Sequence, residues 1–269
     1  MSFLETSIAI ALAGVISIIS VRARVLDLSG GIAAFLLGTI VFSIGGLSAS
    51  IVLILFFIVG SALTRLPRKN HLRPTDDSSQ LSRNWKQVLA NGWIPGVTML
   101  TLYLKPELRE ETTVVFLGAI ATAAADTFAT EIGTRYSKRT VSLATFRPIQ
   151  NGLSGGVSFI GTLASVVGAL TIAVGFYFSR SLGNLCEFAG INWFLPILAA
   201  GFLGAMIDSW LGATIQVKYR CGTCGSITEA RTHCGNVSER ISGITWIDNN
   251  VVNAISILMG GLLYLSLLG

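Results

Sequence analysis

The chain has 269 residues, of which 52% are hydrophobic and only 12% are charged, and its mean hydropathy is +0.68. Soluble domains carry about 25% charged residues, and a soluble fold of this size could not bury so much apolar surface. The net charge of +5 does not indicate nucleic-acid binding, because the basic residues are spread over short segments between apolar blocks. We therefore expect an all-α protein, a polytopic membrane helical bundle that forms a single domain over residues 1–269.

Eight apolar blocks are close in length to the ~20 residues that a helix needs to cross the hydrocarbon core. In chain order they lie at 3–21, 28–45, 47–64, 88–104, 113–134, 152–178, 192–215 and 249–268. The 29 glycines suit close contact between helices in lipid. The sequence thus predicts about eight transmembrane helices, with two long loops at 65–87 and 216–248.

The distribution of basic residues predicts how the chain is oriented. If the N-terminus lies outside, 16 of the 19 Lys and Arg residues fall in inner loops, and only Lys105, Arg109 and Arg180 fall outside. An excess of basic residues is typical of cytoplasmic loops. We therefore expect an outer N-terminus, with both long loops on the cytoplasmic or stromal side.

Three acidic residues, Asp126, Glu131 and Asp208, lie inside predicted spans and fall toward the cytoplasmic side. A charge at a helix centre costs about 2.5–3.5 kcal/mol, so such residues need a partner or a function. Carboxylates gathered without histidine suit Mg²⁺, and we predict that these three bind it and act in catalysis. Asp126 and Glu131 are about 140° apart on a helix, so both reach one site only if the helix is wedged into it or breaks at Gly133. The alternative is that helix ends dip into the headgroups and the acids pair with arginines.

Amide side chains fall at the same predicted level of the membrane. They lie at or near the cytoplasmic starts of the fourth, sixth and eighth spans, and are Asn91, Asn151 and Asn253. Polar groups from five predicted helices thus converge on one leaflet. We expect the three amides to orient phosphates or metal-bound water.

The segment from Asn151 to Thr162 is predicted to open the sixth span with Gly155, Gly156 and Ser158. Exposed backbone N–H groups at a helix start bind phosphate, and glycines permit its close approach. The segment is not a Walker motif, because no Gly-Lys-Ser/Thr follows. The alternative is that these small residues only pack helices together.

Basic residues supply a further candidate for phosphate binding. The inner loop contains the run Arg65-x-x-Arg68-Lys69-x-His71-x-Arg73. Such a cluster either clamps phosphates or meets anionic lipid of the inner leaflet. We place Lys69 or Arg147 near the nucleotide phosphates.

The last inner loop holds most of the cysteines. Cys221-x-x-Cys224 is followed by His233-Cys234. In a reducing compartment this pattern favours either a structural Zn²⁺ site of the Cys₃His type or free thiols and a labile disulfide.

Several of these motifs together resemble the integral membrane phytyl-phosphate kinase family, which includes the chloroplast enzyme of tocopherol synthesis and relatives in cyanobacteria, archaea and animals. The resemblance covers about residues 83–255 and rests on Gln87-Val-Leu-Ala-Asn91-Gly92, Ala125-Asp126-Thr-x-Ala-Thr-Glu131-Ile-Gly133, Gly155-Gly156-Val-Ser158-x-x-Gly161-Thr162-x-Ala-Ser165, Gly204-x-x-x-Asp208-Ser-x-Leu-Gly212-Ala-x-x-Gln216, His233-Cys234-Gly235 and Asn249-x-x-Val-Asn253. The residues before Gly155 depart from the family pattern. The resemblance implies transfer of a γ-phosphate, from CTP, to an isoprenoid monophosphate such as phytyl or geranylgeranyl phosphate.

Two other functions stay open at this point. A CTP-dependent lipid-phosphate cytidylyltransferase would share the metal and nucleotide sites but release pyrophosphate. A transporter would use the buried acids as an ion path, although transporters usually bind near the midplane of the bilayer. The prenyl chain length and the oligomeric state do not follow from the sequence.

Overall fold

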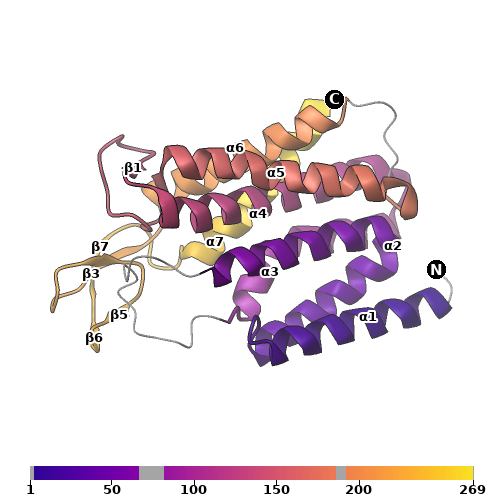
Figure 1. Ribbon diagram of the computed structural model, residues 1–269, viewed down its shortest axis with the longest axis horizontal. Coiled ribbons are helices and arrows are strands. Elements are labelled where there is room, and N and C mark those ends of the chain that lie inside the picture. The colour runs from indigo at the N-terminus through magenta and orange to yellow at the C-terminus, as the bar shows by residue number, and fades with distance from the viewer. Residues whose placement is uncertain (1–2, 67–81, 186–191, 269) are drawn as a thin grey trace.

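The computed structural model describes residues 3–66, 82–185 and 192–268. Its α-helices are α1 (Phe3–Arg22), α2 (Leu28–Arg65), α3 (Trp85–Leu104), α4 (Arg109–Tyr136), α5 (Phe159–Ser179), α6 (Phe194–Thr214) and α7 (Asn249–Leu268), and the short 3₁₀ turns are η2 (Pro106–Leu108) and η3 (Arg180–Leu182). The strands are β1 (Val141–Ser142), β2 (Gly156–Val157), β3 (Lys218–Arg220), β4 (Ile227–Thr228), β5 (Thr232–His233), β6 (Asn236–Val237) and β7 (Glu239–Ser242). The helices form a bundle with the strands of the last loop at one end (Figure 1). The predicted helical membrane bundle is therefore confirmed.

Helix α2 consists of two helical halves joined at a sharp break. Gly46 lies between them with φ 65° and ψ −159°, a conformation that glycine adopts readily. The guanidinium of Arg65, at the end of α2, donates to the carbonyl of Ala23, just before α2 begins. The second half of α2 therefore runs back toward the end of the bundle at which α2 begins (Figure 1). They correspond to the predicted spans 28–45 and 47–64.

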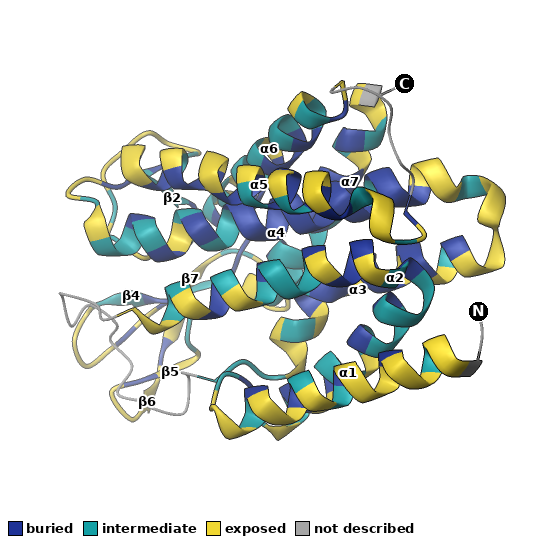
Figure 2. Ribbon diagram, turned by 45° about the vertical axis from the view of Figure 1, so that its right-hand side comes forward, coloured by how far each residue is buried: buried dark blue, intermediate teal, exposed yellow. Residues whose placement is uncertain are grey.

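In the part of the chain that the structure describes, six helices are long and apolar enough to cross a membrane. They are α1, α2, α4, α5, α6 and α7. Helix α3, which contains Pro95, is not among them, and α2 is counted once. The number of eight crossings thus stays a prediction. Large apolar side chains such as Leu12, Phe178 and Leu195 are exposed. Exposed residues lie along the outer faces of the helices, where lipid would contact them (Figure 2).

The sixth predicted span begins later than the sequence indicated. α5 starts at Phe159, and the Ser158 hydroxyl caps it by accepting the Gly161 N–H at 3.1 Å. The residues before it form a turn and strand β2, which pairs with β1. The glycine-serine segment is thus a loop in front of α5 and not its first turn.

Helix α4 is the central element of the bundle. It contacts α2, α3, α5, α6 and α7, and continues without a break through Gly133. The predicted break at Gly133 is therefore absent, and both Asp126 and Glu131 line the cavity described below without such a break. Because other helices surround α4, several of its faces can line an interior cavity.

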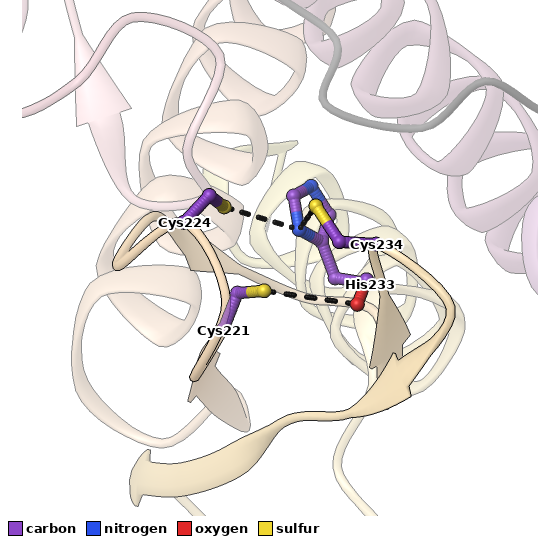
Figure 3. Close-up of side chains that lie close together, drawn as sticks. All are labelled: Cys221, Cys224, His233 and Cys234. Atoms are coloured by element: carbon purple, nitrogen blue, oxygen red, sulfur yellow. Dashed lines mark hydrogen bonds between the residues drawn. The ribbon is translucent and has the colours of Figure 1, made fainter.

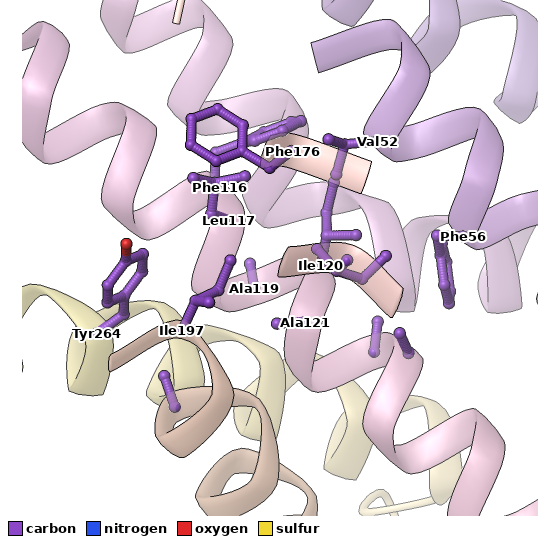
Figure 4. Close-up of a cluster of buried hydrophobic side chains, with 14 of the residues drawn as sticks. Val52, Phe56, Phe116, Leu117, Ala119, Ile120, Ala121, Phe176, Ile197 and Tyr264 are labelled. Atoms are coloured by element: carbon purple, nitrogen blue, oxygen red, sulfur yellow. The ribbon is translucent and has the colours of Figure 1, made fainter. Parts of the chain in front are cut away.

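Small residues allow the helices around α4 to approach closely. A Cβ at Gly168 of α5 would lie 2.6 Å from the carbonyl oxygen of Ala124, so only glycine fits there. Larger side chains fill the core near the middle of α4, among them Phe116, Ile120 and Phe176 (Figure 4). This tight packing fixes the positions of the polar residues at the end of α4.

The loop 216–248 is a small folded unit, which the sequence did not predict. Antiparallel strands in the order β4-β3-β7 form a sheet, and β5 pairs with β6 in a hairpin. Strand β3 follows α6 directly, and α7 begins shortly after β7. The unit is therefore anchored at both ends to helices of the bundle.

Described arginines lie at both ends of the bundle. At one end, Arg65 donates to the Ala23 carbonyl, and an Arg83 nitrogen donates to the Thr64 hydroxyl at 3.2 Å. Arg109 lies at the other end, where its Nε donates to the Asn184 carbonyl at 2.6 Å, beside the break in α2. The side of the membrane on which each end lies stays a prediction.

Candidate functional site

A cavity of about 580 Å³ opens at the end of the bundle that carries the strands. Its walls come from α3, α4, α6 and α7, from the loop before α5 and from the segment around Glu229. Its charged lining residues are Arg83, Asp126, Glu131, Arg135, Asp208 and Glu229. If all are ionised, negative charge exceeds positive charge by two, which favours a bound divalent cation.

Most of the residues singled out in the sequence line this one cavity. They are Asn91, Asp126, Glu131, Asn151, Gly155, Gly156, Ser158, Asp208 and Asn253. Arg147 is exposed and is not part of the lining. Lys69 lies outside the described residues. The fold therefore brings together a set of residues that is spread over more than half of the chain.

The Asp208 carboxylate is fixed by hydrogen bonds from α7. Its Oδ2 accepts the Ser256 hydroxyl at 2.8 Å. With the amide of Asn253 turned so that its nitrogen faces the acid, that nitrogen donates to the same Oδ2 at 3.1 Å. Both of these hydrogen bonds reach the same carboxylate oxygen of Asp208. Asp126, on α4, lines the same cavity as Asp208 and Glu131.

Glu131 occupies a different position from the two aspartates. Its Oε1 accepts the Thr64 hydroxyl at 3.0 Å, and its Oε2 pairs with Arg135 at 3.0 Å. Arg135 also donates to the Leu66 carbonyl at 2.8 Å, so the pair ties α4 to the end of α2. For Glu131, this is the pairing with arginine that the sequence analysis gave as the alternative to metal binding. The role of Glu131 as a Mg²⁺ ligand stays a prediction.

Two cavity residues, Arg83 and Glu229, were not singled out in the sequence. Arg83 lies outside α3, just before the Asn84 cap, and its backbone pairs with the segment before α2, so no helical spacing in the sequence connects it to Gln87 and Asn91. Burial lowers the pKa of Arg83, and the charge of Glu131 opposes that change. Glu229 lies between β4 and β5, and no sequence spacing connects it to the helices.

Glu229 closes the rim of the cavity through a small hydrogen-bond network. Its Oε1 accepts the Ser154 N–H at 2.7 Å, and its Oε2 accepts the Gln216 side-chain amide at 2.9 Å. The same amide donates to the Ser154 hydroxyl at 3.0 Å. The folded loop unit is thereby joined to the glycine-serine loop before α5.

The polar residues of that loop are already engaged within the protein. The Asn151 amide donates to the Thr134 carbonyl at 2.9 Å and accepts from the Thr140 hydroxyl at 3.3 Å. Ser158 caps α5 and accepts the Ser137 hydroxyl at 2.6 Å. These bonds attach the loop to the end of α4. Phosphate binding by Asn151, Gly155, Gly156 and Ser158 stays a prediction.

Gly155 has a structural reason to be glycine. Its φ is +82°, and an added Cβ would lie 2.3 Å from the Cα and the N of Ala213 in α6. We expect Gly155→Ala to lower the free energy of unfolding by on the order of 3 kcal/mol, because backbone strain and overpacking add. Thermal denaturation in detergent measures this loss. Gly14→Ala is the control. A Cβ added at Gly14 would lie 3.8 Å from its nearest neighbour, a side-chain atom of Phe35, so this variant should be about as stable as the wild-type protein.

A second, mostly apolar cavity of about 90 Å³ adjoins the polar one. It lies between α1, the two halves of α2 and the start of α3, with apolar lining residues such as Ile16, Leu37 and Phe56. Arg83, Gln87 and Asn91 line both cavities. A phosphate at this junction would have polar groups on one side and an apolar cavity on the other.

The cysteine and histidine residues of the last loop lie together (Figure 3). One ligand atom each from Cys221, Cys224, His233 and Cys234 lies within 4.8 Å of all the others, and this is the only such group of three or more acids, cysteines or histidines among the described residues. No disulfide joins these cysteines. The Cys224 backbone N–H lowers the pKa of the Cys221 thiol to about 7, whereas desolvation raises the pKa of Cys234 to about 11.

Fold and cavity together define a polytopic membrane protein with a polar, carboxylate-rich site at one end of its helical bundle. The family described as Integral membrane protein DUF92 matches residues 11–261, and the chain belongs to this family. This membership confirms the family resemblance drawn from the motifs.

Relatives are found in plants and archaea. The chain is 32% identical to Protein PGR of Arabidopsis thaliana over 268 residues, which are 93% of this chain and 92% of that protein. It is 30% identical to an uncharacterized membrane protein of Methanocaldococcus jannaschii over 205 residues, 76% of this chain and 80% of the relative. It is 25% identical to Protein VTE6, chloroplastic, of Arabidopsis thaliana over 246 residues, 88% of this chain and 63% of the relative. No solved structure matches the chain.

Proposed function

We propose that this protein transfers the γ-phosphate of a nucleoside triphosphate, CTP, to an isoprenoid monophosphate in a Mg²⁺-dependent reaction. An oxygen of the acceptor phosphate attacks the γ-phosphorus, the bond from that phosphorus to the β-phosphate oxygen breaks, and CDP and an isoprenoid diphosphate result. The acceptor phosphate has a second pKa near 6, so it is ionised at neutral pH and needs no general base. We place the site on the cytoplasmic or stromal side, as the basic residues predict.

The observation that carries this proposal is the junction of the two cavities. A molecule with a phosphate and a hydrocarbon chain needs a polar and an apolar compartment in contact, and Arg83, Gln87 and Asn91 belong to both. The guanidinium of Arg83 suits a phosphate, because it offers several N–H donors in a fixed plane. A cavity of about 90 Å³ takes only the part of the chain nearest the phosphate, and the remainder would extend between helices toward lipid.

Asp126 and Asp208 are the residues that would hold Mg²⁺, which usually binds one or two protein carboxylates together with phosphates and water. When bound, the ion neutralises charge on the transferring phosphate. Ser256 and Asn253 hold one Asp208 oxygen, so the carboxylate is positioned before a ligand arrives. In this proposal Glu131 holds Arg135 and α2 in place, and the loop at Gly155 and Gly156 lies beside the nucleotide phosphates.

Purified protein in detergent, supplied with geranylgeranyl monophosphate, Mg²⁺ and CTP labelled at the α- or γ-phosphate, tests the proposal. We expect CDP and transfer of the γ-label to the lipid. Release of pyrophosphate with the α-label on the lipid would instead identify a cytidylyltransferase. Ion flux in liposomes without nucleotide turnover would identify a transporter.

The apolar cavity leads to a separate prediction about the acceptor. We expect Ala34→Phe, which fills this cavity, to raise the KM for geranylgeranyl monophosphate about tenfold, because burial of about two methylene groups is lost. The KM for CTP should not change. Ala62→Phe, at an exposed position of α2 outside both cavities, is the control. Equal KM values for the acceptor in the two variants would show that the hydrocarbon chain of the acceptor binds outside this cavity.

A further inference from the structure

Four side chains of the folded loop converge on one point outside the polar cavity. The Nδ1 atom of His233 lies 3.4 Å from the Cys224 Sγ and 3.2 Å from the Cys234 Sγ. Cys221 follows strand β3 and completes a group whose ligand atoms all lie within 4.8 Å of one another. The His233 ring is turned so that Nδ1 faces the thiols (Figure 3).

The two Nδ1–Sγ distances are close to those of a tetrahedral Zn²⁺ site, and the remaining ligand atoms, which lie within 4.8 Å of one another, would move together by up to about 1 Å. Zn–S bonds of about 2.3 Å and Zn–N bonds of about 2.0–2.1 Å place the ligand atoms of such a site about 3.5–3.8 Å apart. The separations around Nδ1 need to widen by only a few tenths of an ångström to admit the ion. The adjacent ligands His233 and Cys234 reach the same point because the backbone turns at Cys234, whose φ is 52°.

The cluster is close in sequence to the rim of the polar cavity. Cys224 precedes Glu229 and His233 follows it, so ligation of both would close the short loop that carries Glu229. Glu229 in turn accepts the Ser154 N–H at 2.7 Å. A restraint on this loop is therefore a restraint on the segment in front of α5.

We propose that Cys221, Cys224, His233 and Cys234 bind one structural Zn²⁺ ion, and that this ion positions Glu229 and the Ser154 loop at the rim of the cavity. Closing the loop with metal bonds removes conformational freedom that Glu229 would otherwise have. The zinc has no part in the chemistry at Asp126 and Asp208. It acts as a positioning device for one wall of the site.

Metal analysis of the full chain, purified in detergent without added metal, tests the first part. We expect about one zinc ion per chain, as in structural Cys₃His sites. Cys224→Ser should lose most of the zinc, while Cys186→Ser, which replaces the one cysteine that is not among the proposed ligands, should retain it. Wild-type protein that neither contains zinc nor binds added zinc would overturn the proposal, and so would Cys224→Ser with its zinc intact.

Hydrogen exchange tests the second part without relying on activity. Removing zinc with a chelator should speed exchange of the Ser154 amide, and Glu229→Ala should do the same while keeping the zinc. Amides in the middle of α4 report whether the bundle is intact, and they should stay protected in both cases. An unchanged Ser154 amide in zinc-free protein would overturn the positioning role.

Discussion

Asp208→Asn is expected to reduce phosphoryl transfer by roughly 10³-fold, with little change in stability. A metal ion contributes several kcal/mol of charge stabilisation in such a reaction, and each 1.36 kcal/mol corresponds to a factor of ten in rate. Asparagine keeps the shape and one oxygen that can accept the Ser256 hydroxyl, so the contact between α6 and α7 should persist. Steady-state assays at saturating Mg²⁺ and CTP, with thermal denaturation alongside, measure both effects. Asp126→Asn should behave in the same way.

A matched acid at the other end of the bundle provides the control for this loss. Glu107 is exposed in η2, away from the cavity lining, and Glu107→Gln should keep full activity. Full activity in both Asp126→Asn and Asp208→Asn would remove the proposed metal site. A loss of activity accompanied by a large drop in melting temperature would show that the aspartates matter for folding instead.

Arg83→Gln is expected to lower kcat/KM for the isoprenoid monophosphate about 10- to 100-fold, mainly through KM. A hydrogen bond to a charged group contributes about 1.5–3 kcal/mol, and the neutral amide cannot replace the guanidinium. The backbone of Arg83 pairs with that of Val25 and Asp27, and this pairing does not depend on the side chain. Varying the acceptor and CTP concentrations separately distinguishes the two substrates.

Lys86→Gln is the control for the arginine, because Lys86 is exposed on the same helix start and does not line the cavity. Its kinetic constants should match those of the wild type. Arg83→Lys should recover only part of the loss, since a lysine offers a point charge in place of a planar set of donors. If Arg83→Gln raised the KM for CTP and left that of the acceptor unchanged, Arg83 would belong to the nucleotide site.

The positions of the polar residues were largely predictable from the sequence. Asp126 and Asp208 lie in apolar helices where a charge is costly, and the predicted direction of those helices places both acids at the same end. The same reasoning predicts the positions of Asn91 and Asn253. A regular helix fixes the depth of every residue once its start and its direction are known.

The loops were not predictable in this way. A long inner loop gave no periodic pattern from which the strands around Cys221 and His233 could be inferred, because each strand is only two to four residues long. The loop before α5 was assigned to a helix, and only its contact with Ala213 of α6 shows why Gly155 must be glycine.

The sequence alone shows that this is a helical membrane protein, which residues are polar within the membrane, and at which end of the bundle they lie. The apolar blocks predict the helices, and the distribution of basic residues predicts their direction. Both features are local in the sequence and do not depend on contacts with distant segments. Three further facts come from the folded protein: Glu131 is paired with Arg135, Arg83 lines both cavities, and Glu229 lies at the rim of the polar cavity. Each of these facts depends on contacts between segments far apart in the chain, and such contacts are set by packing.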